Sequence, residues 1–282
     1  MTVRDALTMT VSRLRERGND SPEYEARLMF EGLFGLDRFR MTEERDRELC
    51  HEEEETLLSA IERRGRGEPL QYILGKWEFM GGEYLVGRGV LIPRDDTEVC
   101  VRECIEEIRG IKNPKVLELC SGSGIIAITL SELVRGCTVI AIEKESKAYE
   151  YLEKNIACHG AAGVRALQGD IFLCYDKFED ESFDALISNP PYIEREVIPT
   201  LQREVQFEPE TALDGGTDGL DFYRCIAEKW AVKLRSGGTI SLEIGESQAQ
   251  AVTKLLRAQG FCNIRTVKDI QCLDRVIIGT KR

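Results

Sequence analysis

The residues with the clearest capacity for chemistry are four consecutive ones, Asn189, Pro190, Pro191 and Tyr192. A largely apolar run over residues 183–188, typical of a buried strand, ends directly before them. Neither proline can donate a backbone hydrogen bond, and each favours extended geometry in the preceding residue. The carbonyl oxygens of Asn189 and Pro190 are therefore predicted to be available to a ligand, beside the amide of Asn189. These groups suit an NH₂ group, although X-Pro-Pro also occurs in rigid turns that merely end a strand.

A second group of candidate residues forms a glycine-containing turn between a predicted strand and a predicted helix. Its members are Glu118, Cys120, Ser121, Gly122, Ser123 and Gly124. Glycines at such a turn allow the backbone to approach a ligand closely and leave the first N–H groups of the helix open. Loops of this pattern also occur without a ligand, so the turn alone does not identify a site.

Two acidic residues follow the next two predicted strands. Glu143 ends the second strand about 20 positions after the glycines, where an acidic residue can bind both hydroxyls of a ribose. Asp170 and Ile171 stand where the third strand should end, and the carboxylate of Asp170 can accept a hydrogen bond from an adenine amino group. The glycine turn and the two acids together predict an adenosine site.

The motifs that are missing narrow the choice of adenosine cofactor. A dinucleotide fingerprint requires a third glycine where this chain has Ala127, and the Walker A sequence is absent. A site with acidic residues and no basic ligand for a phosphate favours a cationic cofactor without phosphate. S-adenosyl-L-methionine fits this description.

The elements that must position these residues alternate between strands and helices. Strands are predicted at 116–119, 138–142, 185–188 and 239–244, with helices near 124–134, 146–158 and 219–235. This order predicts a parallel sheet with helices on both faces and ligands at the carboxyl ends of the strands. Residues 262–268 and 274–280 are expected to pair antiparallel at one edge of the sheet.

The N-terminal third has a different pattern. Apolar residues at helical spacing predict a small helical domain over residues 1–74, with one of its helices starting at Ser21-Pro22. A glycine-rich stretch over 75–92 predicts a β-hairpin linker, and 93–282 is expected to be the cofactor-binding domain. The helix that opens this last domain has Asp95, Asp96 and Thr97 as candidate capping residues.

The order of these motifs resembles the Rossmann-like class I methyltransferases that modify amino groups with S-adenosylmethionine. More narrowly, nearly the whole chain resembles the HemK/PrmC family, the peptide chain release factor glutamine N(5)-methyltransferases. The stretches that carry this resemblance, besides the motifs above, are 67–75, 78–79, 91–98, 207–209, 218–220, 223–224, 242–245 and 274–277.

The resemblance implies an α/β fold with an N-terminal helical domain, a hairpin linker and a seven-stranded methyltransferase domain. It implies methyl transfer to the glutamine of a Gly-Gly-Gln motif in release factors, which yields S-adenosyl-L-homocysteine, and a helical domain that helps to hold the release factor. Asn189, Pro190 and Tyr192 would be catalytic, with Tyr192 packed over the amide of the substrate. Asn189 would also border the cofactor, and Pro191, Arg94 and Thr97 would complete the substrate pocket.

Two departures from the family pattern concern the site. Cys120 stands where the family usually has glycine, so its side chain is expected to crowd the methionine end of the cofactor. Asp95 and Asp96 replace the Pro-Glu of the family, which loosens the wall of the substrate pocket but keeps Arg94 and Thr97.

Charge and composition limit the alternatives. The 282 residues carry a formal net charge of −12, and the only compact basic cluster is Arg63, Arg64 and Arg66. This argues against a methyltransferase for the amino groups of DNA bases, which would flip its target base and needs a basic groove. A glutamine methyltransferase that acts on a ribosomal protein and a non-enzymatic scaffold that only binds the cofactor stay open.

The remaining expectations concern metals, membranes and cellular location. The ten cysteines are scattered without a C-x-x-C pair, so no metal site is expected. No apolar run approaches the roughly 20 residues that span a bilayer, and no secretory signal is present. We expect a cytoplasmic monomer that binds neither DNA nor membranes.

Overall fold

The computed structural model describes all 282 residues, which form two compact units. The first comprises Met1–Lys76 and Gln202–Phe207, and the second comprises Trp77–Leu201 and Glu208–Arg282. The sequence placed boundaries after residues 74 and 92 and did not indicate that 202–207 would join the helical unit.

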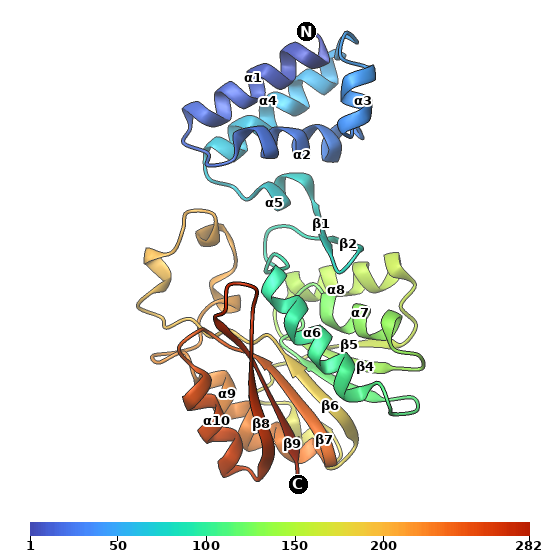
Figure 1. The fold of residues 1–282 in the computed structure, drawn as a ribbon, viewed down its shortest axis with the longest axis vertical. Helices are drawn as coiled ribbons and strands as arrows, with labels where there is room; N and C mark the ends of the chain where they lie inside the picture. The colour runs from blue at the N-terminus through green and yellow to red at the C-terminus, as the bar shows by residue number, and fades with distance from the viewer. The chain divides into compact units, whose positions relative to one another are not determined.

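The first unit is built from helices, shown in blue to cyan in Figure 1. They are α1 (Val3–Glu16), α2 (Pro22–Phe34), α3 (Arg38–Glu43), α4 (His51–Gly65) and α5 (Leu70–Leu74). The apolar faces of α1, α2 and α4 meet in a core that fully buries Leu14, Phe30 and Leu57. The start of α2 at Pro22 was expected, whereas α3 and α5 were not.

The basic cluster of this unit is neutralised by carboxylates of the same unit. Arg64, with 11% of its side chain exposed, donates to Glu25 at 2.6 and 3.0 Å and to Glu204 of the 202–207 segment at 2.9 Å. Arg63 and Arg66 are also paired with acidic side chains. The cluster therefore serves internal ion pairs and offers little free positive charge.

The second unit contains a seven-stranded sheet in the order β5-β4-β3-β6-β7-β9-β8, which confirms the expected fold class. Its strands are β3 (Lys115–Leu119), β4 (Thr138–Glu143), β5 (Val164–Gln168), β6 (Phe183–Ser188), β7 (Leu234–Glu243), β8 (Phe261–Lys268) and β9 (Asp274–Lys281). Strands β3 to β7 are parallel, and β9 runs antiparallel to both β7 and β8. The short strands β1 (Lys76–Phe79) and β2 (Gly82–Leu85) form a separate two-stranded sheet.

Helices cover both faces of the large sheet, as Figure 1 shows. They are α6 (Asp95–Ile108), α7 (Ile125–Leu133), α8 (Ser146–His159), α9 (Asp221–Cys225) and α10 (Ala249–Ala258). One core holds α6, α7 and α8 against side chains such as Val116, and the other holds α9 and α10 against side chains such as Leu117. After α9 the chain continues through a π-helical segment (Ile226–Trp230) and a 3₁₀ turn (Ala231–Lys233). Helix α10 was not expected from the sequence.

The register of the parallel strands brings the predicted motifs to one edge. Leu119 at the end of β3 pairs with Ile142 of β4 and with Ser188 of β6, and Ser188 pairs with Leu242 of β7. The glycine turn, residues 189–192 and the acidic ends of β4 and β7 therefore leave the sheet side by side.

Candidate active site

A cavity of about 250 Å³ lies at the carboxyl ends of the parallel strands. Most of the residues predicted for the site line it: Arg94, Thr97, Glu118, Cys120, Ser121, Gly122, Ser123, Glu143, Asp170, Ile171, Asn189 and Pro191. Gly124, Pro190 and Tyr192 do not line it. The fold thus gathers three separate sequence motifs around one hollow.

The glycine turn has an unusual backbone at alternate positions. Cys120, Gly122 and Gly124 have φ angles of 59°, 55° and 85°, in the left-handed region that favours glycine. Cys120 thus adopts a conformation that glycine adopts more easily, at the position where the resemblance predicts a glycine. A Cβ atom on Gly124 would lie 2.4 Å from Cδ1 of Leu152, so this glycine is required where the turn meets helix α8.

The turn is also held by a side chain that the sequence did not single out. Asn155 of α8 is fully buried, and its Nδ2 donates to the carbonyl oxygens of Ser123 at 2.9 Å and of Leu85 at 3.0 Å. Its Oδ1 accepts the N–H of Leu85 at 2.7 Å. The only signal in the sequence was an Asn on the face of this amphipathic helix that is expected to be buried.

The carboxylate of Glu143 faces the cavity from the end of β4. Its Oε2 accepts the N–H of Gly122 at 2.8 Å, and its Oε1 accepts the N–H of Glu145 at 2.7 Å. Burial raises the pKa of Glu143, while these N–H groups act in the opposite direction. Each oxygen retains a lone pair, so the group can still accept hydrogen bonds from hydroxyls of a ligand.

Glu118 is a buried carboxylate with one unpartnered oxygen. Its Oε2 accepts the N–H of Ala127 at 3.2 Å, whereas its Oε1 and the nearby hydroxyl of Ser121 form no hydrogen bond of normal geometry. Burial raises the pKa of Glu118 to about 8, and the charge of Glu143 adds to the shift. A positively charged ligand in this cavity would relieve both effects, so the residues present fit a cationic cofactor.

Asp170 is paired with a lysine that the sequence analysis did not consider. Its Oδ1 accepts the N–H of Phe172 at 2.9 Å, and its Oδ2 lies 3.1 Å from Nζ of Lys144. Lys144 and Phe172 also line the cavity. The role of Asp170 as the ligand of an adenine amino group stays a prediction.

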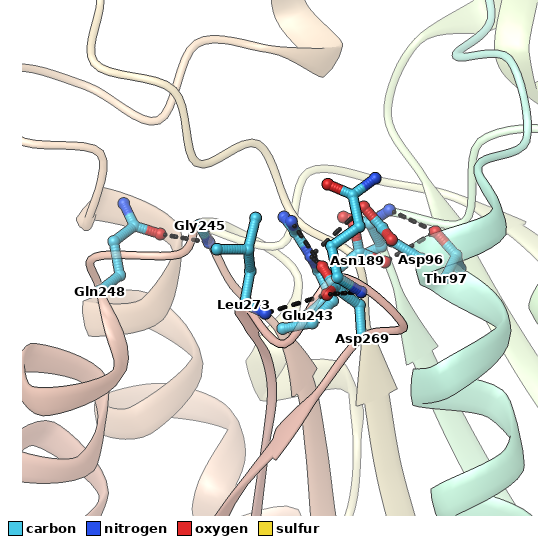
Figure 2. Close-up of polar contacts among 10 residues, drawn as sticks. Asp96, Thr97, Asn189, Glu243, Gly245, Gln248, Asp269 and Leu273 are labelled. Atoms are coloured by element: carbon cyan, nitrogen blue, oxygen red, sulfur yellow. Dashed lines mark hydrogen bonds and ion pairs between the residues drawn. The ribbon is translucent and has the colours of Figure 1, made fainter.

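Asn189 is the first member of a chain of hydrogen bonds that runs through Thr97 to Glu243, from distant parts of the sequence (Figure 2). Its Nδ2 donates to the hydroxyl of Thr97 at 3.0 Å, and this hydroxyl donates to Oε2 of Glu243 at 2.7 Å. Helix α6 has no side-chain cap, so the capping role expected for Asp95, Asp96 or Thr97 is wrong. No protein group donates to the carbonyl oxygens of Asn189 and Pro190.

Charged side chains surround Glu243, the buried end of the hydrogen bonds that connect it through Thr97 to Asn189. Nε of Arg275 lies 3.3 Å from Asp96, and its Nη2 lies 3.0 Å from Asp269. Asp269 also accepts the N–H of Leu273 at 3.0 Å, which fixes the turn between β8 and β9 (Figure 2). Burial raises the pKa of Glu243 to about 7, although the hydrogen bond from Thr97 opposes the shift.

Tyr192 packs beside the cavity without lining it. Its ring lies against the apolar core beneath α9 and α10, and burial raises its pKa to about 12. Its carbonyl oxygen accepts Nε2 of Gln248 at 3.0 Å, and the same nitrogen donates to Gly219 at 3.1 Å. Oε1 of Gln248 accepts the N–H of Gly245 at 2.9 Å (Figure 2). A Cβ atom on Gly219 would lie 2.4 Å from the oxygen of Tyr192, so only glycine allows this approach.

Arg94 is fixed by a buried carboxylate. Glu208 accepts the N–H of Ile92 at 2.9 Å and forms an ion pair with the guanidinium of Arg94. Because Arg94 lines the cavity and so do Pro209 and Thr211 shortly after Glu208, this contact joins two segments of the cavity wall.

Sequence reasoning missed Glu243, Gln248, Lys144 and Asn155 as contributors to the site. Glu243 had a signal, because an acidic residue ends an apolar strand there just as Glu143 does. The structure contains no group of three or more His, Cys, Asp or Glu side chains arranged for a metal ion. None of its helices combines the length and the apolar character needed to cross a membrane.

Comparisons with known proteins agree over the whole length. Residues 5–75 match the family model of the PrmC N-terminal domain, and residues 111–268 match a methyltransferase domain model. The release factor glutamine methyltransferase of Geobacter sulfurreducens is 38% identical over 279 residues, which cover 99% of this chain and 96% of the relative. The enzyme of the same name from Clostridium botulinum is 36% identical over 283 residues and is covered completely, as is this chain.

A solved structure supports the fold alone. The hMettl16 catalytic domain in complex with the MAT2A 3'UTR hairpin 6 superposes with a TM-score of 0.59 at 15% identity, over 82% of each chain. At this identity the likeness concerns the arrangement of the sheet and its helices.

Proposed function

Because this chain belongs to the release factor glutamine methyltransferase family, we propose that it methylates the side-chain amide nitrogen of a glutamine in peptide chain release factors. The glutamine would be that of the Gly-Gly-Gln motif, the methyl donor S-adenosyl-L-methionine and the second product S-adenosyl-L-homocysteine. The observation that carries the proposal is the fixed amide of Asn189 at the cavity, whose nitrogen is bound by Thr97 and whose oxygen is left for an NH₂ donor.

The cofactor would occupy the side of the cavity formed by β3 and β4. Glu143 would bind the ribose hydroxyls, and Glu118 with Ser121 would face the positive charges of the cofactor, since both have unpartnered oxygens there. S-adenosylmethionine, when bound, supplies a methyl group on a sulfonium that is already activated for transfer. The protein therefore has to orient the nucleophile, and a strong base is not required.

The substrate amide would be held by the groups after β6. A glutamine nitrogen is a poor nucleophile, because its lone pair is delocalised into the carbonyl group. The side-chain oxygen of Asn189 and the carbonyl oxygen of Pro190 would accept its two hydrogens and direct the nitrogen toward the methyl group. As the nitrogen gains positive charge, these acceptors bind it more tightly, so they stabilise the transition state more than the ground state. After the transfer the nitrogen loses one of its two protons to solvent, which gives the neutral N-methyl amide. Orientation alone contributes roughly 7–11 kcal/mol in well-aligned reactions.

The test is a transfer assay with a located product. The protein is incubated with radiolabelled S-adenosylmethionine and a purified release factor, and the modified residue is identified by mass spectrometry. One methyl group on the Gly-Gly-Gln glutamine is expected, and a release factor with asparagine at that position should stay unlabelled. Labelling of a ribosomal protein in preference to any release factor would contradict the assignment.

Partners and location follow from the same proposal. A release factor acts in translation, so the enzyme would work in the cytoplasm on a protein partner. The N-terminal helical unit would contact that partner, in keeping with its match to the PrmC N-terminal domain. Binding to DNA is not part of the proposal, because the net charge is −12 and the arginine cluster is paired internally.

A further inference from the structure

We propose that Glu243 is a positioning residue that fixes which end of the Asn189 amide faces the substrate, acting through the hydroxyl of Thr97. This inference rests on the proposed methylation of glutamine and adds a residue outside the cavity to it. Thr97 and Asn189 line the cavity, whereas Glu243 does not.

The direction of the hydrogen bonds carries the inference. An ionised carboxylate has no proton to donate, so the single proton of the Thr97 hydroxyl must point to Glu243 over the 2.7 Å contact. Only lone pairs of that hydroxyl then remain for Asn189, 3.0 Å away. The amide must therefore present Nδ2 to Thr97 and leave Oδ1 as an acceptor.

The orientation of Asn189 decides what the site can bind. With Oδ1 free, the site accepts a hydrogen from the NH₂ of a glutamine. If the amide were turned over, its Nδ2 would face the NH₂ of the substrate. Both groups are donors, so the substrate would lose an acceptor. The geometry therefore makes Glu243 a determinant of selection for an amide nitrogen.

Burying the carboxyl group of Glu243 costs stability, and a residue that only fills space in the core would not need such a group. Glu243 is 1% exposed, and no other hydrogen bond to its carboxylate is formed besides that from Thr97. The ionisable groups that face it come from every neighbouring element: Asp96 and Cys100 of α6, Arg94 before it, Arg275 of β9, Tyr192 after β6 and Tyr223 of α9. The positive charges of Arg94 and Arg275 favour the ionised form that the relay requires.

The pH dependence has a defined sign. Burial raises the pKa of Glu243 to about 7 in the free protein. Below that pH the protonated carboxyl can donate to Thr97, the Thr97 proton can turn to Asn189, and the amide can reverse. Turnover of the wild-type protein should therefore rise as the pH increases through about 7.

The experiment compares kcat, KM and cofactor affinity in a double-mutant cycle of Glu243→Gln and Thr97→Val. A glutamine at 243 would direct its oxygen to the positive charge of Arg275 and its NH₂ to Thr97, which reverses the relay. We expect kcat to fall roughly 10- to 100-fold in each single variant, the loss typical of a misplaced reacting group, while the affinity for S-adenosylmethionine stays unchanged. The double variant should be no slower than Thr97→Val, Thr97→Ser should restore turnover, and the pH profile of Glu243→Gln should be flat near 7.

A matched control separates positioning from stability. Asp184 is another buried carboxylate, at the opposite end of β6, where it accepts the N–H of Lys115 at 2.8 Å and pairs with Arg235. Asp184→Asn should lower the melting temperature and leave the pH profile unchanged. A Glu243→Gln protein with wild-type kcat, or losses that multiply in the double variant, would overturn the proposal.

A second measurement keeps the relay testable if the proposed substrate is wrong. The side-chain amide of Asn189 is followed by NMR in asparagine-labelled protein without substrate, as the pH is varied. Its resonances should titrate near pH 7 in the wild type and stay constant in Glu243→Gln. Wild-type protein that fails to label any release factor would disprove the function, whereas an Asn189 amide insensitive to pH would disprove the relay.

Discussion

The two sides of the cavity are built in different ways. On the side of β3 and β4, backbone N–H groups hold the carboxylates, as Gly122 and Glu145 hold Glu143. On the side of β6 and β7, side chains hold side chains, and Thr97, Asn189 and Glu243 come from three remote segments. Carboxylates on the cofactor side are thus fixed by the backbone around them, whereas orientation of the reacting amide depends on side chains from remote segments.

The strongest test of this comparison is the loss of the reacting-side amide. Asn189→Ala should reduce kcat by roughly 100-fold or more, as removal of one preorganised polar group does in other enzymes. The dissociation constant of S-adenosylmethionine, measured by calorimetry, should change little, because Asn189 and the hydroxyl of Thr97 that holds it belong to the substrate side. Unimpaired methylation with normal cofactor affinity would show that the amide does not act on the substrate.

The opposite effect is expected on the cofactor side. Glu143→Ala removes a charged acceptor of ligand hydroxyls and should weaken S-adenosylmethionine by about 1.5–3 kcal/mol, or roughly 10- to 150-fold in Kd. Once the cofactor is saturating, kcat should recover most of its value. Glu143→Gln serves as the control of similar shape, and a Kd that does not move in Glu143→Ala would reject the ribose role.

The cofactor side should also show a pH-dependent stability effect, through Glu118. The folded protein holds a proton on Glu118 up to about pH 8, whereas an unfolded Glu loses it near 4.5. The folded state thus binds more protons between these values, so ionisation of Glu118 destabilises it as the pH rises. Glu118→Gln should therefore gain in melting temperature relative to the wild type between pH 5 and pH 8, without cofactor. A difference that stays constant over this range would mean that Glu118 is already ionised.

The smallest effect concerns the strained turn. Cys120→Ala keeps a Cβ atom at a φ of 59°, whereas Cys120→Gly does not. The glycine variant should be the more stable of the two by about 1 kcal/mol in chemical denaturation. Equal stabilities would imply that the surrounding turn relaxes when the side chain is shortened.

The same contrast explains what could be predicted from the sequence. The glycine turn, Glu143 and the alternation of strands with helices follow local patterns, and the structure reproduces the fold and gathers these residues around one cavity. Thr97 was given a capping role because capping is a short-range rule, but its hydroxyl bonds to Glu243, which is 146 positions away. No local pattern carries that information.

Two further differences have physical causes of the same kind. The contact of the Tyr192 ring with the apolar core was not expected, since sequence alone does not determine to which side a side chain turns after a strand ends, and its place over the substrate amide stays a prediction. Residues 202–207 belong with the helical unit, where Glu204 pairs with the largely buried side chain of Arg64. That pairing joins residues 140 positions apart, which only the folded chain reveals.

The contacts of Gln248 have a consequence for protein engineering. The side chain of Gln248 donates to the carbonyl oxygen of Tyr192, while the carbonyl oxygens of Asn189 and Pro190 accept no hydrogen bond from the protein. A residue 56 positions downstream thus removes the carbonyl of Tyr192 from the acceptors available to a ligand. Grafting Asn189 to Tyr192 alone onto another sheet would therefore transfer the sequence without the arrangement of its hydrogen-bond acceptors. A working transplant would have to carry Gln248 and the bare backbone of Gly219 with it.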